Sequence, residues 1–367
     1  MNDMTQAPGM RAGEAASGVT VVDCDIHPAV KSWNDLRPYL SDRWWDYLQT
    51  YGLRARHGFM RGTPYPKMAP LATRRDAWPE EGQPGSDLEL MRRQHLDPLG
   101  IEMGVLNPLS PTGGDQNPDF SAALCAATND WQREAWTRHE PRLRASIVVP
   151  YEDGEASRAE IRRHAGVRDF CQVLLLSRTS EPLGKRRYWP IYEAATEQGL
   201  PVAVHVFGYS GYPLTGSGWP SFYIEEGAAH PASCQASIAS LIFEGVFERY
   251  PTMKFLVIEA GFAWLPAFAW RLDKIWSRMR DEVPHVRRPP SEYIREHVWL
   301  TTQPMEEATR PRQVMDVMAW IGWDKLLFAS DYPHWDFDDP RYSLPPVMSP
   351  EQKSAVRFGN ARALYGV

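Results

Sequence analysis

The sequence predicts an α/β protein built as a (β/α)8 barrel, and three observations indicate this fold. Short, nearly continuous apolar runs recur eight times along the 367 residues, and amphipathic helical segments separate several of them. The composition, 43% hydrophobic and 23% charged, suits a protein with a large core. Parallel strands that helices cover on both faces have this continuous apolar character. An open doubly wound sheet is the alternative, but the chain has neither a GxGxxG nor a GxxxxGK[ST] motif.

The predicted elements follow one another in the order that a barrel requires. Strands are expected at 19–25, 101–108, 144–150, 171–177, 201–208, 254–261, 297–302 and 326–333. The clearest amphipathic helices are expected at 120–139, 154–165, 188–199 and 233–251. Residues 1–18 are small and polar, so we expect a disordered tail, and 19–367 form a single barrel domain. Within it, 34–100 is an insertion rich in Trp and Pro that is expected to act as a lid, because long loops of this kind often form one.

Charge and cysteine usage exclude several classes of protein. The net charge of −6 and the absence of a basic run argue against nucleic acid or an anionic membrane surface as a partner. No apolar stretch approaches the ~20 residues that cross a bilayer, and the N-terminus lacks a signal-peptide core, so we expect a cytoplasmic protein. The cysteines form no CxxC pair, which argues against a disulfide framework or structural zinc site; they are Cys24, Cys125, Cys171 and Cys234.

Titratable residues gather where the predicted strands end, which is where barrels carry their chemistry. Imidazole and carboxylate groups together are how a catalytic Zn²⁺ or similar ion is commonly held. Asp25 and His27 are two residues apart and are expected to face the same side of the first strand. Asp23 shares that parity, but Asp25 lies nearer the strand end and is preferred. The later strand ends carry His205, Glu259, Asp331 and His334.

Three motifs in this order resemble the amidohydrolase superfamily: DCDIH at 23–27, VAVHV at 202–206 and SDYPH at 330–334. Segments 188–206, 240–273 and 324–334 resemble the branch related to aminocarboxymuconate semialdehyde decarboxylase, and the likeness extends over roughly 19–367. The resemblance implies a barrel with one divalent metal ion, with Zn²⁺ expected and Mn²⁺ as the alternative. It implies that the metal ligands are Asp25, His27, His205 and Asp331.

The sequence departs from the family pattern at two positions. Asp25 stands where many relatives have His, and a carboxylate remains a competent ligand for Zn²⁺ or Mn²⁺. Glu259 stands where the decarboxylase branch often has an acid/base His, so either Glu259 or His230 is expected to take that role beside Asp331. The fourth strand has no lysine to bridge two metals, which favours a single ion.

Further residues are expected around this site, each with a structural alternative. Residues expected to bind the substrate are Trp219, Tyr223, Arg271 and His334, although aromatic loop residues such as Trp219 often only pack the loop. Arg271 is expected to pair with Glu259, because a buried carboxylate needs a partner. His334 is expected to orient Asp331. His230 is as readily explained as a loop histidine.

The resemblance implies a metal-dependent enzyme that acts on a small molecule. We expect non-oxidative decarboxylation of a small aromatic or unsaturated carboxylic acid. Metal-dependent hydrolysis of a lactone, ester or amide, with Asp331 accepting the proton of the attacking water, is the alternative. A barrel that only binds a ligand is a more distant one. Family likeness also suggests a homodimer.

Overall fold

Eight parallel strands form one sheet in the computed structural model, which describes residues 20–53, 72–110, 113–206, 213, 215–218 and 220–367. Neighbours in the sheet are also neighbours in sequence, from β1 to β8. Backbone hydrogen bonds from Cys24 N to Phe328 O and from His27 N to Tyr332 O bring β1 beside the end of the last strand. The predicted (β/α)8 barrel is thus confirmed. The strands are β1 (Val21–Ile26), β2 (Ile101–Leu106), β3 (Leu143–Val148), β4 (Phe170–Leu176), β5 (Val202–His205), β6 (Phe255–Ile258), β7 (Val298–Thr301) and β8 (Leu326–Leu327).

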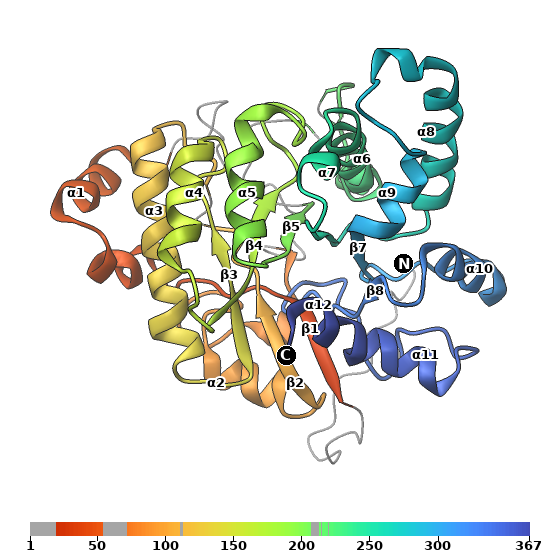
Figure 1. Ribbon diagram of the computed structural model, residues 1–367. Helices are drawn as coiled ribbons and strands as arrows, with labels where there is room; N and C mark the ends of the chain where they lie inside the picture. The colour runs from red at the N-terminus through yellow and green to blue at the C-terminus, as the bar shows by residue number, and fades with distance from the viewer. Residues whose placement is uncertain (1–19, 54–71, 111–112, 207–212, 214, 219) are drawn as a thin grey trace.

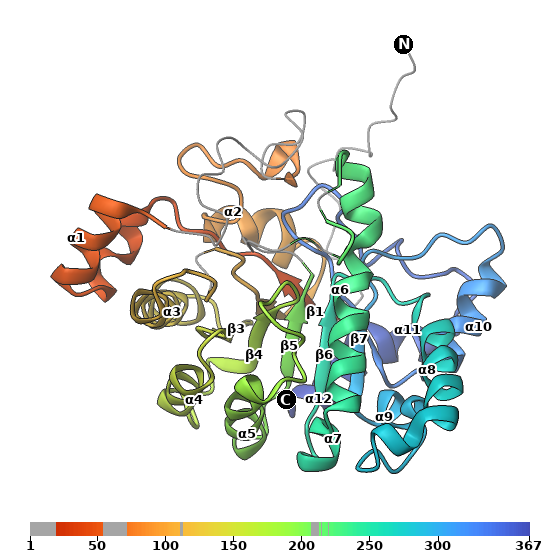
Figure 2. The ribbon, with the colours of Figure 1, turned by 90° about the horizontal axis from the view of Figure 1, so that it is seen from above.

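Helices surround the strands (Figures 1 and 2). Local capping fixes where several of them begin: Asn117 accepts a hydrogen bond from Phe120 N at the start of α3, and Asp153 does the same for Ala156 N in α4. The main helices are α3 (Pro118–Gln132), α4 (Gly154–Arg163), α5 (Trp189–Glu197), α6 (Tyr223–Phe243), α7 (Val246–Arg249), α8 (Leu265–Met279), α9 (Pro290–His297), α10 (Pro311–Ile321), α11 (Pro350–Ser354) and α12 (Asn360–Tyr365). No helix among the described residues has the length and apolar character to cross a membrane.

The predicted insertion at 34–100 contains α1 (Asp42–Tyr51) and α2 (Leu88–Met91), and 54–71 lie outside the described residues. Trp44 and Tyr47 of α1 pack on Phe120 of α3, so α1 lies at the outside of the barrel (Figure 1). The tail at 1–18 is also outside the described residues. The division into tail, barrel and lid stays a prediction.

The C-terminal helix α12 closes one end of the barrel. Leu364 and Ala361 pack with the interior residues Cys24, Leu174 and Leu256. Leu364 O also accepts a hydrogen bond from Lys254 Nζ, just before β6 begins. This end is therefore the amino-terminal end of the strands, and the opposite end is free to carry the predicted site.

Candidate metal centre

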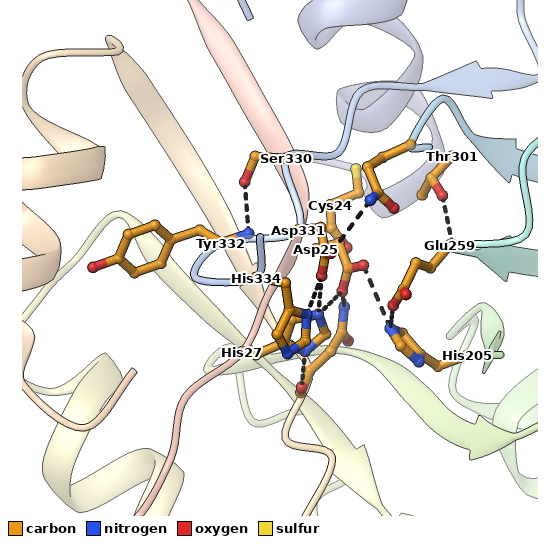
Figure 3. Close-up of polar contacts among 12 residues, drawn as sticks. Cys24, Asp25, His27, His205, Glu259, Thr301, Ser330, Asp331, Tyr332 and His334 are labelled. Carbon is orange, nitrogen blue, oxygen red and sulfur yellow. Dashed lines mark hydrogen bonds and ion pairs between the residues drawn. The ribbon is translucent and has the colours of Figure 1, made fainter. Parts of the chain in front are cut away.

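Six titratable side chains converge at the carboxyl ends of β1, β5, β6 and β8 (Figure 3). All are buried except His334, whose side chain is 17% exposed. Potential ligand atoms lie within 4.8 Å of one another in two overlapping groups that share His27 and Glu259. The first group is Asp25, His27, His205 and Glu259, and the second is His27, Glu259, Asp331 and His334.

The two histidines at the centre of the site point the same ring nitrogen at carboxylates. His27 Nε2 lies 2.8 Å from Asp331 Oδ1 and 3.3 Å from Asp25 Oδ1. His205 Nε2 lies 2.7 Å from Glu259 Oε2 and 3.5 Å from Asp25 Oδ2. Asp25 therefore lies between the two imidazoles. At the edge of the site, His334 Nδ1 contacts Asp331 Oδ1 at 2.5 Å.

An irregularity in β1 separates Asp25 from Asp23. The register of β1 against β2 shifts between Asp23 and Ile26, so the simple alternation that we expected does not hold there. Asp23 accepts hydrogen bonds from His95 Nε2 at 2.7 Å and from the Ser330 hydroxyl at 2.6 Å. Its carboxylate is occupied by these partners, and Asp25 is the aspartate that joins the group.

Two of the carboxylates stand on strained backbone. Glu259 and Asp331 have φ angles of 60° and 64°, in the left-handed region that costs a non-glycine residue about 1–2 kcal/mol. Glu259 N donates to Thr301 Oγ1, and Asp331 N donates to Asp25 O, which holds both turns in place. Strain of this kind is typical of functional sites, where surrounding contacts maintain it.

Opposite charges dominate the ionisation of the first group. Burial alone would raise the pKa of Asp25, but the charges of His27 and His205 hold it well below its usual range. Burial alone would lower the pKa of His205, but the charges of Glu259 and Asp25 raise it to about 10. His27 also has a raised pKa, because Asp25 and Asp331 outweigh the effect of its burial.

The second group behaves differently. Burial and the nearby charge of Glu259 raise the pKa of Asp331 well above its usual range. Burial and the charge of His27 lower the pKa of His334 to about 4, so His334 is neutral at pH 7. Asp336, in the same loop, has a pKa raised to about 8 by burial and by Asp331. The site therefore combines a carboxyl group whose pKa is raised with a neutral imidazole beside it.

The donor set fits a divalent cation. Among the described residues, the ion-pair partners of Asp25, Glu259 and Asp331 are all histidines. Asp25 Oδ2 and Glu259 Oε2 are buried and lie 3.5 and 2.7 Å from His205 Nε2, in an arrangement that does not meet the geometry of a hydrogen bond. Buried carboxylate oxygens without a donor are costly unless a cation compensates them. Imidazole and carboxylate are the ligands that Zn²⁺ and Mn²⁺ take.

Not every predicted site residue lies in these groups. Arg271 is exposed on α8, and Glu259 pairs with His205 instead, so the predicted Arg271–Glu259 pair is wrong. His230 lies in α6, outside both groups. Burial lowers its pKa, the charge of Glu259 opposes this shift, and the charge of Arg178 adds to it. Trp219 and the side chain of Tyr223 are outside the described residues.

Sequence reasoning missed three residues that support the site. Asn107, one residue past β2, donates to Asp25 Oδ1 at 2.8 Å, and its carbonyl oxygen lies 2.7 Å from His27 Nδ1. Gln303, after β7, donates to Asp331 Oδ2 at 3.3 Å. Asp336 follows β8. The position of Asn107 and Gln303 just after β2 and β7 was the available signal, but amides alone do not indicate a metal site.

A cavity of about 840 Å³ lies among the loops that follow β2, β3 and β4. Its walls include Tyr151, Glu152, the buried Arg178 and Ser180. None of the six converging residues is among its described lining residues. We therefore locate the chemistry from the ligand atoms and their charges, and not from the size of this cavity.

Comparison with known proteins gives relatives over nearly the whole chain. A family model described as amidohydrolase matches residues 22–367. The gamma-resorcylate decarboxylase of Polaromonas sp. is 25% identical over 308 residues, which cover 78% of this chain and 90% of that protein.

Solved structures share the fold. The 5-carboxyvanillate decarboxylase of Novosphingobium aromaticivorans, in complex with manganese and 4-hydroxy-3-methoxy-5-nitrobenzoic acid, has a TM-score of 0.71 at 18% identity. That match covers 96% of this chain and 98% of the other. An amidohydrolase from Mycobacterium avium subsp. paratuberculosis has a TM-score of 0.72 at 22% identity and covers 96% and 99%.

Proposed function

The chain belongs to the amidohydrolase family, and from this premise we propose that it is a metal-dependent carboxy-lyase that decarboxylates a small aromatic acid without an oxidant. The observation that carries the proposal is the buried convergence of Asp25, His27, His205 and Glu259, in which the ion-pair partners of both carboxylates among the described residues are histidines. The decarboxylase relatives favour this reaction over hydrolysis.

We assign one divalent ion to this site, held by Asp25, His27 and His205 and flanked by the carboxylates of Glu259 and Asp331. Mn²⁺ replaces the expected Zn²⁺ as our preferred ion, because carboxylate oxygen suits Mn²⁺ and a related decarboxylase contains manganese. When bound, the ion would act as a Lewis acid that orients and polarises the oxygens of the substrate.

Asp331 is the proton carrier in this proposal. Loss of CO₂ breaks the bond between the carboxyl carbon and the ring, and the electron pair of that bond remains on the ring carbon, which must take up a proton. The raised pKa of Asp331 favours its protonated form, which a proton donor requires. His334 contacts Asp331 and is partly exposed, so it can return a proton from solvent to Asp331 after each turnover.

Glu259 has a different role from Asp331. Its pKa is lowered, because the charge of His205 outweighs the effect of its burial. It is therefore ionised at neutral pH and acts as a ligand or as a fixed charge that keeps the proton on Asp331. His230 lies close enough to feel that charge and would contact the substrate from α6. The pocket roles of Trp219 and Tyr223, the homodimer and the cytoplasmic location stay predictions.

A substrate screen with added Mn²⁺ tests the proposed reaction. CO₂ release would be measured from hydroxybenzoates, including 2,6-dihydroxybenzoate, and from muconate-type acids, and compared with hydrolysis of lactones, esters and amides. We expect Mn²⁺-dependent CO₂ release from at least one aromatic acid. Hydrolysis without CO₂ release would replace the lyase by a hydrolase, and no Mn²⁺-dependent reaction in either set would favour a barrel that only binds a ligand.

A further inference from the structure

Asn107 contacts both β1 members of the metal centre. It follows β2 directly and is completely buried. Its backbone N–H donates to Ile26 O at 2.7 Å, which fixes it beside β1. Its backbone carbonyl oxygen accepts a hydrogen bond from His27 Nδ1 at 2.7 Å, and its side-chain Nδ2 donates one to Asp25 Oδ1 at 2.8 Å. One residue thus holds one atom of each of two proposed ligands.

The orientation of the Asn107 amide is fixed by its other partners. Oδ1 accepts from the Ser146 hydroxyl at 2.6 Å and from Gln172 Nε2 at 2.9 Å, and the second hydrogen of Nδ2 points at Cys24 O at 3.0 Å. An inverted amide would place its oxygen against Cys24 O and Asp25 Oδ1, which are both acceptors. Every donor and acceptor of the side chain is therefore used in one arrangement.

We propose that Asn107 is a positioning residue that decides which ligand atoms face the metal. Because Asp25 Oδ1 accepts from the amide, Oδ2, which faces His205 Nε2 at 3.5 Å, is the oxygen left for a cation. Because a backbone carbonyl oxygen only accepts, His27 Nδ1 carries a proton, which leaves Nε2 as the ring nitrogen that can bind a metal. This inference rests on the metal site proposed above.

The same hydrogen-bond chain reaches the opposite end of the barrel. Gln172 Oε1 accepts from the Tyr365 hydroxyl at 2.9 Å, and Tyr365 is the last residue of α12. Asn107, Ser146, Gln172 and Tyr365 therefore form a polar line through the interior, from the metal centre to the helix that closes the barrel.

Manganese affinity is the direct measure of this role. Replacing Asn107 by Ala leaves Asp25 Oδ1 without its donor and lets the carboxylate rotate away from the orientation that presents Oδ2. Residues that orient metal ligands typically change metal affinity by about 10-fold to 100-fold when they are lost. We expect a weakening in that range, measured with Mn²⁺ alone by chelator competition on the metal-free protein.

Asn129 provides a matched control. It is also completely buried and makes four side-chain hydrogen bonds, with Val148 N, Val148 O, Glu160 and Gln132, far from the metal ligands in sequence and in its contacts. Asn129→Ala should lower the melting temperature, as we also expect for Asn107→Ala, but should keep the Mn²⁺ affinity of the wild type. Equal Mn²⁺ affinity of wild type and Asn107→Ala would overturn the proposal.

Two further measurements keep the test decisive. If Asn107→Ala does not fold, Gln172→Met removes one of the two donors that hold the amide, and a folded Gln172→Met protein with wild-type Mn²⁺ affinity would then refute the positioning role. The wild type separates the two proposals: if it fails to bind Mn²⁺, the metal site itself is wrong, whereas binding that is insensitive to Asn107 rejects only the inference about Asn107.

Discussion

Replacement of Asp331 by Asn tests the proposed proton carrier with little change of shape. Asn is among the residues that tolerate a φ of 64°, so the strained turn should persist. Oδ1 can still accept from His334 Nδ1, and the weak bond from Gln303 Nε2 to Oδ2, 3.3 Å long, is lost. One such bond contributes about 1 kcal/mol, which corresponds to a fall in melting temperature of about 2 °C in a protein of this size.

The expected effect on catalysis is far larger than the effect on stability. An amide cannot carry the transferred proton, and general acid–base groups typically contribute ~10²–10⁴-fold to the rate. We expect kcat to fall by that factor, measured as CO₂ release by the Mn²⁺-loaded enzyme, while most of the metal is retained. Asp338→Asn is the control, because Asp338 lies in the same loop with a pKa raised to about 7 by burial but accepts from Met305 N, outside the metal groups. Near-wild-type turnover of Asp331→Asn would remove Asp331 from the catalytic step.

Three further outcomes are expected. Gly85→Ala should weaken Mn²⁺ binding, because a Cβ there would lie 2.2 Å from His27 O. Gly166 has a similar positive φ but open space around it, so Gly166→Ala should cost about 1–2 kcal/mol of stability and leave Mn²⁺ binding intact. Equal Mn²⁺ binding by the two variants would contradict this. Burial alone would raise the pKa of Glu160, but hydrogen bonds from His164, Arg163 and Asn129 lower it from its usual 4.5 to about 2. About 3 kcal/mol of folding stability should therefore be present above pH 4.5 and be lost as the pH falls toward 2. Urea unfolding of the metal-free protein at a series of pH values should show this loss in the wild type but not in Glu160→Gln, and parallel curves would refute it. Chelation of the metal should lower the melting temperature, because an ion at 100 times its Kd stabilises the native state by about 2.7 kcal/mol, and an unchanged melting temperature would count against a bound ion.

The strands were predictable from sequence because each is buried on both faces and reads as an apolar run. Val202–His205 and Phe255–Ile258 are examples, and the polar residue at or just after each end marked the mouth of the barrel. The last strand was predicted too long, at 326–333, although its ladder ends at Leu327. Asp331, with its positive φ, lies in the part of that run that is irregular.

Contacts within the site were less predictable, because they depend on which side chains meet across the barrel. The register of β1 shifts after Asp23, and Asp23 contacts His95, 72 residues away in the sequence. Hydrophobic periodicity alone does not indicate this register shift. Glu259 meets His205 of the neighbouring strand, and not the arginine on the following helix. Asn107 looked like an ordinary strand-end residue until its contacts with Asp25 and His27 were seen.

Metal content is the most direct test of the metal centre. Wild type, His205→Ala and His297→Ala would be loaded with Mn²⁺, dialysed and analysed for metal per chain. His297 is the control, because it is also a buried histidine but contacts Met253 O and stacks on Phe247, away from the metal ligands. The account predicts about one Mn²⁺ per chain in the wild type and in His297→Ala and almost none in His205→Ala, since catalytic sites of this kind depend on each of a few protein ligands. Full retention of Mn²⁺ by His205→Ala would contradict it.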